Sequence, residues 1–257
     1  MNRHHKDILE RIRERSGTPT QHTFLDKYLG NDHPKYSISV PTLRSIAKDW
    51  MQAHPELSAD ALAALLTSLV KGESSTEKCV AGILLDYATP EQRKFDPKLF
   101  DSWLDHLEGW VEVDTVCTGK YGAAEIPAQW GRWKKLILKF SKSSNINKRR
   151  ASLVLCCSPL RSVKDDRLAD LALDTVDRLK HEKAILITKA ISWVLRSMEK
   201  HYRKKLKQYL NKNMDTLPKI AVRETMAKLT TGVKGKASKD LRKAFHSFIS
   251  QTQRYPL

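Results

Sequence analysis

The sequence is poor in the residues that interrupt helices and form turns. Of its 257 residues, 10 are glycine and 10 are proline. An all-β protein needs many more turns than these positions supply, and collagen-like or low-complexity chains need far more of both residues. With 40% hydrophobic and 29% charged residues, the composition is that of a globular protein. A chain of this length buries roughly 70–75% of its extended surface, so a core can form without disulfides.

Long apolar runs are also lacking. The richest one, residues 59–70, is about as long as one short helix and contains Asp60, Thr67 and Ser68. A membrane span needs roughly 18–20 apolar residues. The N-terminal sequence MNRHHKDILERIRERS carries charge but no apolar stretch of the kind found in secretory signals. We therefore expect a cytoplasmic protein that does not act at a membrane.

Cysteines are few, and no metal motif is present. The four cysteines form no CxxC pair, and the adjacent Cys156 and Cys157 have poor geometry for bridging each other. All four are predicted to be buried thiols of a cytosolic protein. The sequence contains no HExxH, Walker, GxGxxG or GxSxG motif and no cluster with metal-ligand spacing. We expect neither a metal nor a cofactor.

Positive charge is abundant, and it is concentrated in the second half of the chain. Residues 1–140 contain 19 Lys and Arg against 19 Asp and Glu, whereas residues 141–257 contain 27 against 10. The whole net charge of +17 therefore belongs to the second part. Clustered cations attract polyanions and release counterions when they bind nucleic acid. Nucleic acid is the favoured partner; the alternatives are an anionic membrane and a basic surface without a polyanionic partner.

Helix signals recur along the whole chain, and no segment alternates as a strand does. Three segments are typical of helix starts: Thr89-Pro90-Glu91-Gln92, Ser74 with Glu77, and Asp96-Pro97. Two segments are typical of breaks between helices: residues 30–34 and Ser158-Pro159. The predicted helices cover residues 4–15, 20–29, 41–54, 59–71, 75–88, 97–107, 112–121, 127–141, 147–157, 165–180, 183–200, 202–212, 217–229 and 237–251.

These lengths predict an all-α protein. Helices of ten to eighteen residues with short links favour stacked antiparallel pairs of about 35–40 residues, the period of HEAT-like α-solenoids. A globular helical bundle is the alternative, because self-similarity between the segments is weak. We expect residues 1–257 to form one domain.

A tryptophan lies on the polar side of the helix predicted for residues 183–200. With residues placed about 100° apart, Ile187, Ile191 and Val194 form the core face. Lys189, Trp193, Arg196 and Lys200 fall on the opposite face. A ring among cations is typical of a nucleic-acid surface, in which cations hold phosphates and the ring packs on a sugar or base. Alternatively, a neighbouring helix or the lysine stems cover the ring.

A second tryptophan, Trp110, precedes Asp114 by four residues, so both share one face if the segment is helical. A carboxylate beside an aromatic wall can stabilise a developing cation; the alternative is an ordinary acid near a helix N-terminus. Farther along, Arg149 and Arg150 open a helix that is apolar nearly all round. Because an unpaired buried charge is costly, one of them must reach a rim or an anion.

One more basic segment is the loop at residues 231–239, which contains Lys234 and Lys236. It is interpreted either as a phosphate-binding loop or as a solvated turn.

Four stretches together resemble the AlkD-like DNA alkylation repair glycosylases. They are SVPTLRSIAKDW (39–50), GWVEVDTV (109–116), NKRRASLVL (147–155) and TKAISWVLRSMEKH (188–201). Their order and separations agree over roughly residues 25–230, which leaves 236–257 as a C-terminal helix or tail outside the resemblance. Gly109 and Val111 depart from the family pattern, which often has an aromatic and an acidic residue there.

The resemblance implies a HEAT-like solenoid with a concave basic groove for duplex DNA. It implies hydrolysis of the N-glycosidic bond of N3- or N7-alkylated purines by a monomeric, monofunctional glycosylase. Asp114, Trp110, Trp193 and Arg150 match the family's catalytic positions. Arg150 is expected to grip a phosphate, and Asp114 to stay ionised and stabilise an oxocarbenium-like sugar. Arg149, Lys189, Arg196, Lys200, Lys234 and Lys236 are the predicted DNA contacts. The alternatives are a solenoid that binds nucleic acid without catalysis and a scaffold for protein partners.

Overall fold

The computed structural model describes residues 1–20 and 30–233. Within these ranges it contains thirteen α-helices and no β-strand, apart from an isolated bridge between Thr20 and Lys35. The predicted all-α class is therefore confirmed for this part of the chain. The helix predicted at 237–251, the tail at 236–257 and nearly all of the helix predicted at 20–29 lie outside the described residues.

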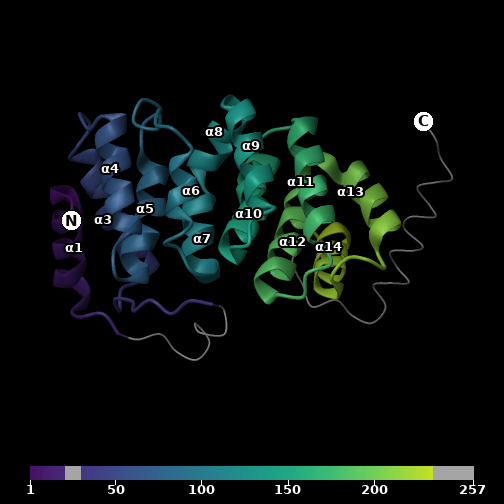
Figure 1. Ribbon diagram of the computed structural model, residues 1–257, viewed down its shortest axis with the longest axis horizontal. Helices are drawn as coiled ribbons and strands as arrows, with labels where there is room; N and C mark the ends of the chain where they lie inside the picture. Colours follow the sequence, from purple (N-terminus) through teal and green to yellow (C-terminus); the bar gives the residue numbers. More distant parts are fainter. Residues whose placement is uncertain (21–29, 234–257) are drawn as a thin grey trace.

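The helices stand side by side in chain order along the long axis of the molecule, from α1 at one end to α13 and α14 at the other (Figure 1). Their bounds are α1 Arg3–Ser16, α3 Val40–Gln52, α4 Ala59–Val70, α5 Ser75–Tyr87, α6 Leu99–Trp103, α7 Gly109–Cys117, α8 Lys120–Ala128, α9 Trp130–Phe140, α10 Ile146–Ser162, α11 Asp166–Leu179, α12 Ile185–Ser197, α13 Glu199–Asn213 and α14 Lys219–Thr231.

One continuous row of helices runs through the structure. In the order α3, α5, α7, α10, α12 and α14, each helix packs against the next, and we call this set the first row. Other helices pack against it, including α4 on α5, α8 and α9 on α10, and α13 on α14. Segments far apart in the sequence are thereby brought together, and α7, α10 and α12 become neighbours.

Serine side chains cap several helix starts, one of which the sequence predicted. The Ser39, Ser58 and Ser74 side chains each accept a hydrogen bond from a backbone N–H in the first turn of α3, α4 and α5. Ser74 and Glu77 form the complete capping box that the sequence predicted. Thr89 and Gln92 also exchange the expected hydrogen bonds, at 2.9 and 3.3 Å, but they close a single turn with no helix after it. Pro97 follows too closely for a helix to continue from there.

Two boundaries differ from the prediction for reasons of packing. Ser158-Pro159 does not end α10, which continues to Ser162 with the proline inside it. Because α10 packs against α7, α8, α9, α11 and α12, these contacts outweigh the backbone hydrogen bond that Pro159 loses. The segment 183–200 is divided instead, since α12 ends at Ser197 and α13 begins at Glu199.

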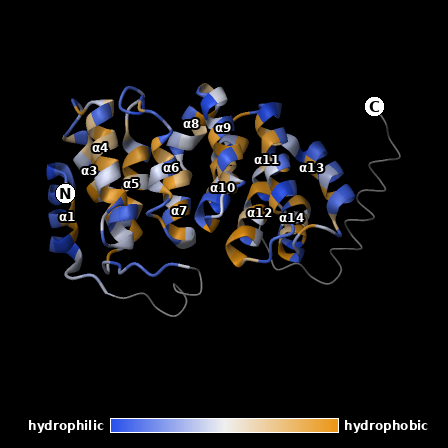
Figure 2. Ribbon diagram, viewed as in Figure 1, coloured by the Kyte–Doolittle hydropathy of each residue, from blue (hydrophilic) through white to orange (hydrophobic). Residues whose placement is uncertain are grey.

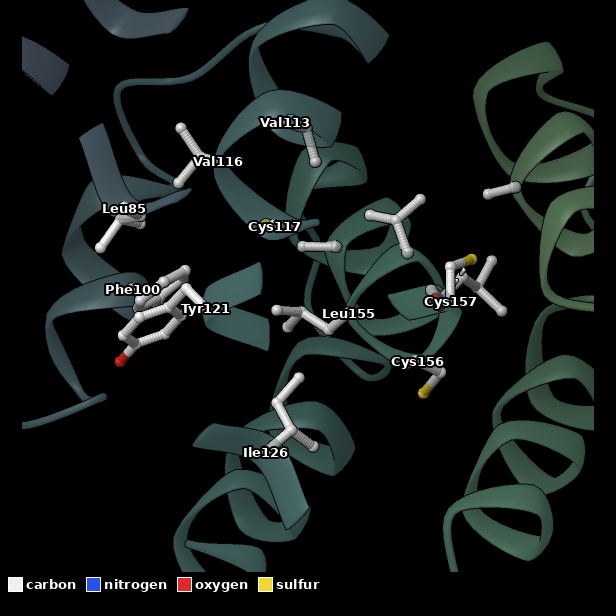
Figure 3. Packing of buried hydrophobic residues seen from close by; sticks show 14 of the residues in the cluster. Leu85, Phe100, Val113, Val116, Cys117, Tyr121, Ile126, Leu155, Cys156 and Cys157 are labelled. Atoms are coloured by element: carbon white, nitrogen blue, oxygen red, sulfur yellow. Dashed lines mark hydrogen bonds between the residues drawn. The ribbon is translucent and has the colours of Figure 1, made fainter. Parts of the chain in front are cut away.

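The buried apolar residues form one core cluster between the helices. In Figure 2 most helices carry both hydrophobic and hydrophilic residues along their length. In the centre, the rings of Phe100 and Tyr121 stack with their centroids 5.6 Å apart (Figure 3). All four cysteines are free and buried, as predicted, and Cys156 and Cys157 point in different directions. No helix of the described chain is long and apolar enough to cross a membrane.

A glycine sets the distance between α5 and α7. A Cβ atom at Gly82 would lie 2.2 Å from the carbonyl oxygen of Thr115, so any larger residue would push the two helices apart. Since α7 carries both Trp110 and Asp114, this close approach fixes how far those two side chains stand from the rest of the first row.

Candidate functional site

A pocket of about 460 Å³ opens where α7, α10 and α12 meet. This volume lies in the range of small-molecule sites. Two apolar residues, Ile185 and Leu186, form part of its wall. The other lining residues are all among those singled out from the sequence: Trp110, Asp114, Arg150, Lys189, Trp193 and Arg196.

The carboxylate of Asp114 lies at this pocket and is held by Arg150. Asp114 is only 9% exposed. The Arg150 Nε donates to Oδ1 at 2.8 Å, and Nη2 donates to Oδ2 at 2.7 Å. A carboxylate has about four acceptor positions, so this two-pronged contact leaves capacity for a water molecule or a substrate atom.

Arg150 is almost completely buried, with 3% of its surface exposed. Besides its two bonds to Asp114, its Nη1 donates a hydrogen bond to the carbonyl oxygen of Leu186. One guanidinium thus links α7, α10 and α12. Because an unpaired buried charge is costly, the sequence predicted that one of the two arginines would reach a rim or an anion. For Arg150 that anion is Asp114. In this structure the guanidinium of Arg150 is directed at Asp114, and its expected contact with a phosphate stays a prediction.

Two opposing effects set the acidity of Asp114. Burial raises the pKa of its carboxyl group above the ordinary value, because the charged form is removed from water. The Arg150 guanidinium opposes this rise by attracting the negative charge and donating hydrogen bonds to it. The two-point contact with Arg150 is the geometry of an ionised carboxylate. An aspartate buried to this degree without a neighbouring cation would become protonated at a higher pH.

The two predicted tryptophans stand on opposite helices of the pocket. Trp110 lies in the first turn of α7, one turn before Asp114, and remains 40% exposed. Gly109 begins that helix with a φ of +62°, a conformation that a residue with a Cβ rarely adopts. Trp193, on α12, is partly buried against the core, so the alternative of a covered ring holds in part. Its remaining surface lines the pocket.

Apart from Arg149, the predicted DNA contacts fall into three groups. Lys189 and Arg196 line the pocket; Arg196 Nε lies 3.3 Å from Ser192 Oγ and 3.6 Å from a carboxylate oxygen of Glu224. Lys200 does not share a helix with Trp193, because α12 has already ended; it lies in the first turn of α13. Lys234 and Lys236 lie outside the described residues.

Arg149 is engaged in a structural contact away from the pocket. It pairs with Glu182 at 2.8 and 3.1 Å, and its Nη1 donates to the carbonyl oxygens of Ser143 and Ser144. These bonds tie the start of α10 to the segment before it and to the loop after α11. The two adjacent arginines therefore have separate roles in the structure.

Sequence reasoning missed Arg161, whose guanidinium carbon lies 5.9 Å from the centre of the Trp193 ring. A signal for it was present. Arg161 follows Arg150 by eleven residues on α10, and eleven residues are close to three full turns, so both residues lie on the same face of the helix.

Comparison with known proteins agrees with the resemblance. The model of a family described as DNA alkylation repair enzyme matches residues 10–229. A solved structure described as a predicted DNA alkylation repair enzyme from Enterococcus faecalis is similar, with a TM-score of 0.61 and 17% identity over 76% of this chain and 87% of that one. At this identity the likeness shows a shared fold. No curated protein matches the sequence.

Proposed function

Because the chain belongs to the DNA alkylation repair enzyme family, we propose that it is a DNA glycosylase for N3- and N7-alkylated purines in duplex DNA. The observation that carries this proposal is the placement of one buried carboxylate, Asp114, in an open pocket between Trp110 and Trp193. A glycosylase for cationic bases needs a negative charge that can interact with the sugar. It also needs surroundings that tolerate positive charge.

The chemistry follows from the charge of the lesion. Alkylation at N3 or N7 makes the purine cationic, so it leaves as a neutral base and needs no general acid. As the bond breaks, positive charge develops on the sugar, as in other glycoside hydrolyses. Asp114 stabilises that charge and orients the attacking water. The reaction forms a free base and an abasic site, and no lysine nucleophile or strand cleavage is required.

The other pocket residues act on binding and orientation. The faces of Trp110 and Trp193 favour the polarised, partly cationic sugar over a neutral one. Lys189 and Arg196 stand beside them and attract the phosphates on either side of the lesion. Arg150 holds the Asp114 carboxylate in one orientation, which makes it a positioning residue.

For the architecture, we interpret the first row as one layer of a HEAT-like solenoid. In this proposal a concave groove follows α3, α5, α7, α10, α12 and α14, and the duplex lies along it as a substrate of a monomeric protein. Lys189 and Arg196, two of the cations in the basic part of the chain, would then face the DNA.

The direct test is a base-release assay on duplex DNA that contains 7-methylguanine. We expect the purified protein to release the free methylated base and to leave an abasic site without cutting the strand. A protein that binds duplex DNA with steep salt dependence and releases no base would instead be a non-catalytic DNA-binding protein.

The acidity of Asp114 predicts the pH dependence of this reaction. Only the ionised carboxylate stabilises the sugar, and burial raises the pKa of Asp114. The single-turnover rate of base release should therefore fall as the pH is lowered, beginning at a higher pH than an exposed aspartate would allow. DNA binding measured at each pH serves as the control. A rate that stays constant down to the ordinary pKa of aspartate would contradict the role of Asp114.

A further inference from the structure

A cluster of basic side chains lies where the end of α10 meets the start of α13. The carbonyl oxygen of Arg161 accepts a hydrogen bond from Lys200 Nζ at 3.4 Å, and His201 Nε2 lies 3.1 Å from the same oxygen. The guanidinium of Arg161 donates to Ser197 Oγ at 3.0 Å and to Ser158 Oγ at 3.3 Å. We call Arg161, Lys200 and His201 the Arg161 cluster.

The Arg161 cluster has no acidic partner. Within residues 1–20 and 30–233, the hydrogen bonds and ion pairs of these three side chains involve only hydroxyl and carbonyl oxygens. Other cations of α13 are paired differently, since Arg203 contacts Glu199 and Lys205 contacts Asp170. Lys200 and His201 precede a kink at Tyr202, where the backbone of α13 leaves the helical conformation. An anion bound at this point would relieve the repulsion between Arg161 and Lys200.

The cluster adjoins the proposed active site through Trp193. Arg161 stands over the indole at 5.9 Å, and the indole lines the pocket that contains Asp114. Phosphates recur about every 3.4 Å of helix axis along one strand of duplex DNA. A strand that passes the pocket therefore brings another phosphate to the Arg161 cluster within one or two nucleotides.

Arg161 retains donors for such a phosphate. A guanidinium has five N–H groups, and the two hydrogen bonds to Ser197 and Ser158 use one on each terminal nitrogen. The serine hydroxyls fix the plane of the group, so the remaining N–H groups are already oriented. A planar donor set of this kind suits phosphate better than a mobile ammonium does.

We propose that the Arg161 cluster binds a backbone phosphate of the duplex, one or two nucleotides from the nucleotide at Asp114. The inference rests on the proposed function in one respect, that duplex DNA is the substrate. Arg161 then has two roles, as a phosphate ligand and as the cation that packs on Trp193. This phosphate contact carries no information about the lesion, so it contributes equally to methylated and undamaged DNA.

The test is the salt dependence of binding to an undamaged duplex, measured by fluorescence anisotropy for the wild type and for Arg161→Gln. Loss of one phosphate contact should reduce the slope of log K against log salt by about 0.9. Arg161→Lys keeps the charge and should keep the slope. Lys200→Gln leaves Arg161 in place and should lower the slope in the same direction, and thermal melting shows whether each variant is folded.

Arg167→Gln is the matched control. Arg167 also stands over a tryptophan, with its guanidinium carbon 5.2 Å from the Trp130 ring, but it is exposed and paired with Asp165. Its loss changes the net charge by the same amount and should leave the slope unchanged.

The outcomes separate this inference from the proposed function. If wild-type protein releases base while folded Arg161→Gln and Lys200→Gln retain the wild-type slope, the phosphate site is overturned and the glycosylase stands. If the wild type releases no base but these variants lower the slope, the DNA contact stands and the glycosylase proposal fails. If Arg161→Gln and Arg167→Gln lower the salt slope by the same amount, the effect is a general one of charge, and the phosphate site is also overturned.

Discussion

Replacing Asp114 with asparagine should lower the rate of base release by about a thousandfold. A unit negative charge about 4 Å from the developing positive charge on the sugar is worth about 4 kcal/mol at an effective dielectric near 20, which corresponds to that factor in rate. Asparagine keeps the shape and removes the charge. The measurement is single-turnover release of 7-methylguanine with protein in excess over DNA, so that binding does not limit the rate.

The contact with Arg150 calls for a second variant in this experiment. Asparagine in place of Asp114 leaves the guanidinium of a 3%-exposed arginine without its anion. Breaking a buried ion pair costs about 3–5 kcal/mol of stability, so a poorly folded Asp114→Asn would also be inactive. The double variant Asp114→Asn with Arg150→Gln removes both charges and should recover much of that stability. It should still release base about a thousandfold more slowly than the wild type.

Replacing Arg150 alone with glutamine should have the second largest effect, this time on stability. The variant leaves the Asp114 carboxylate buried and unpaired, which should lower the free energy of unfolding by about 3–5 kcal/mol. Chemical denaturation measures this loss. Because the opposing charge of Arg150 is gone, the pKa of Asp114 should rise further, and the acid-side loss of base release should move to higher pH.

The same variant distinguishes a positioning residue from a phosphate ligand. If Arg150 acts through Asp114, as its three internal hydrogen bonds indicate, the salt dependence of DNA binding should not change. Arg161→Gln provides the comparison, since its slope should fall. A stable Arg150→Gln protein with a reduced salt slope would contradict a purely positioning role and would support the expected contact of Arg150 with a phosphate.

Features set by local spacing could be predicted from the sequence. Trp110 and Asp114 are four residues apart, and α7 does place them one turn apart at one pocket. The positions of Lys189, Trp193 and Arg196 on one face of α12 follow from the helical period in the same way. The scarcity of glycine and proline argued against an all-β protein, and the recurring helix signals without alternating segments predicted the all-α class.

Features set by packing between distant segments could not be predicted from the sequence. The partner of Arg150 lies 36 residues away and is decided by how α7 packs on α10, which no local pattern encodes. Pro159 remains inside α10 because six neighbouring helices pack against that helix. Lys200 was assigned to the wrong helix because its periodicity continues that of α12 beyond Ser197, where the helix ends.

The central claim is that the Asp114 carboxylate performs base release. Its most direct test is the single-turnover assay on duplex DNA containing 7-methylguanine, with wild type beside the double variant Asp114→Asn with Arg150→Gln. Both proteins should bind the duplex with the same salt slope, and the double variant should form free 7-methylguanine about a thousandfold more slowly than the wild type. Release by the folded double variant at the wild-type rate would contradict the central claim.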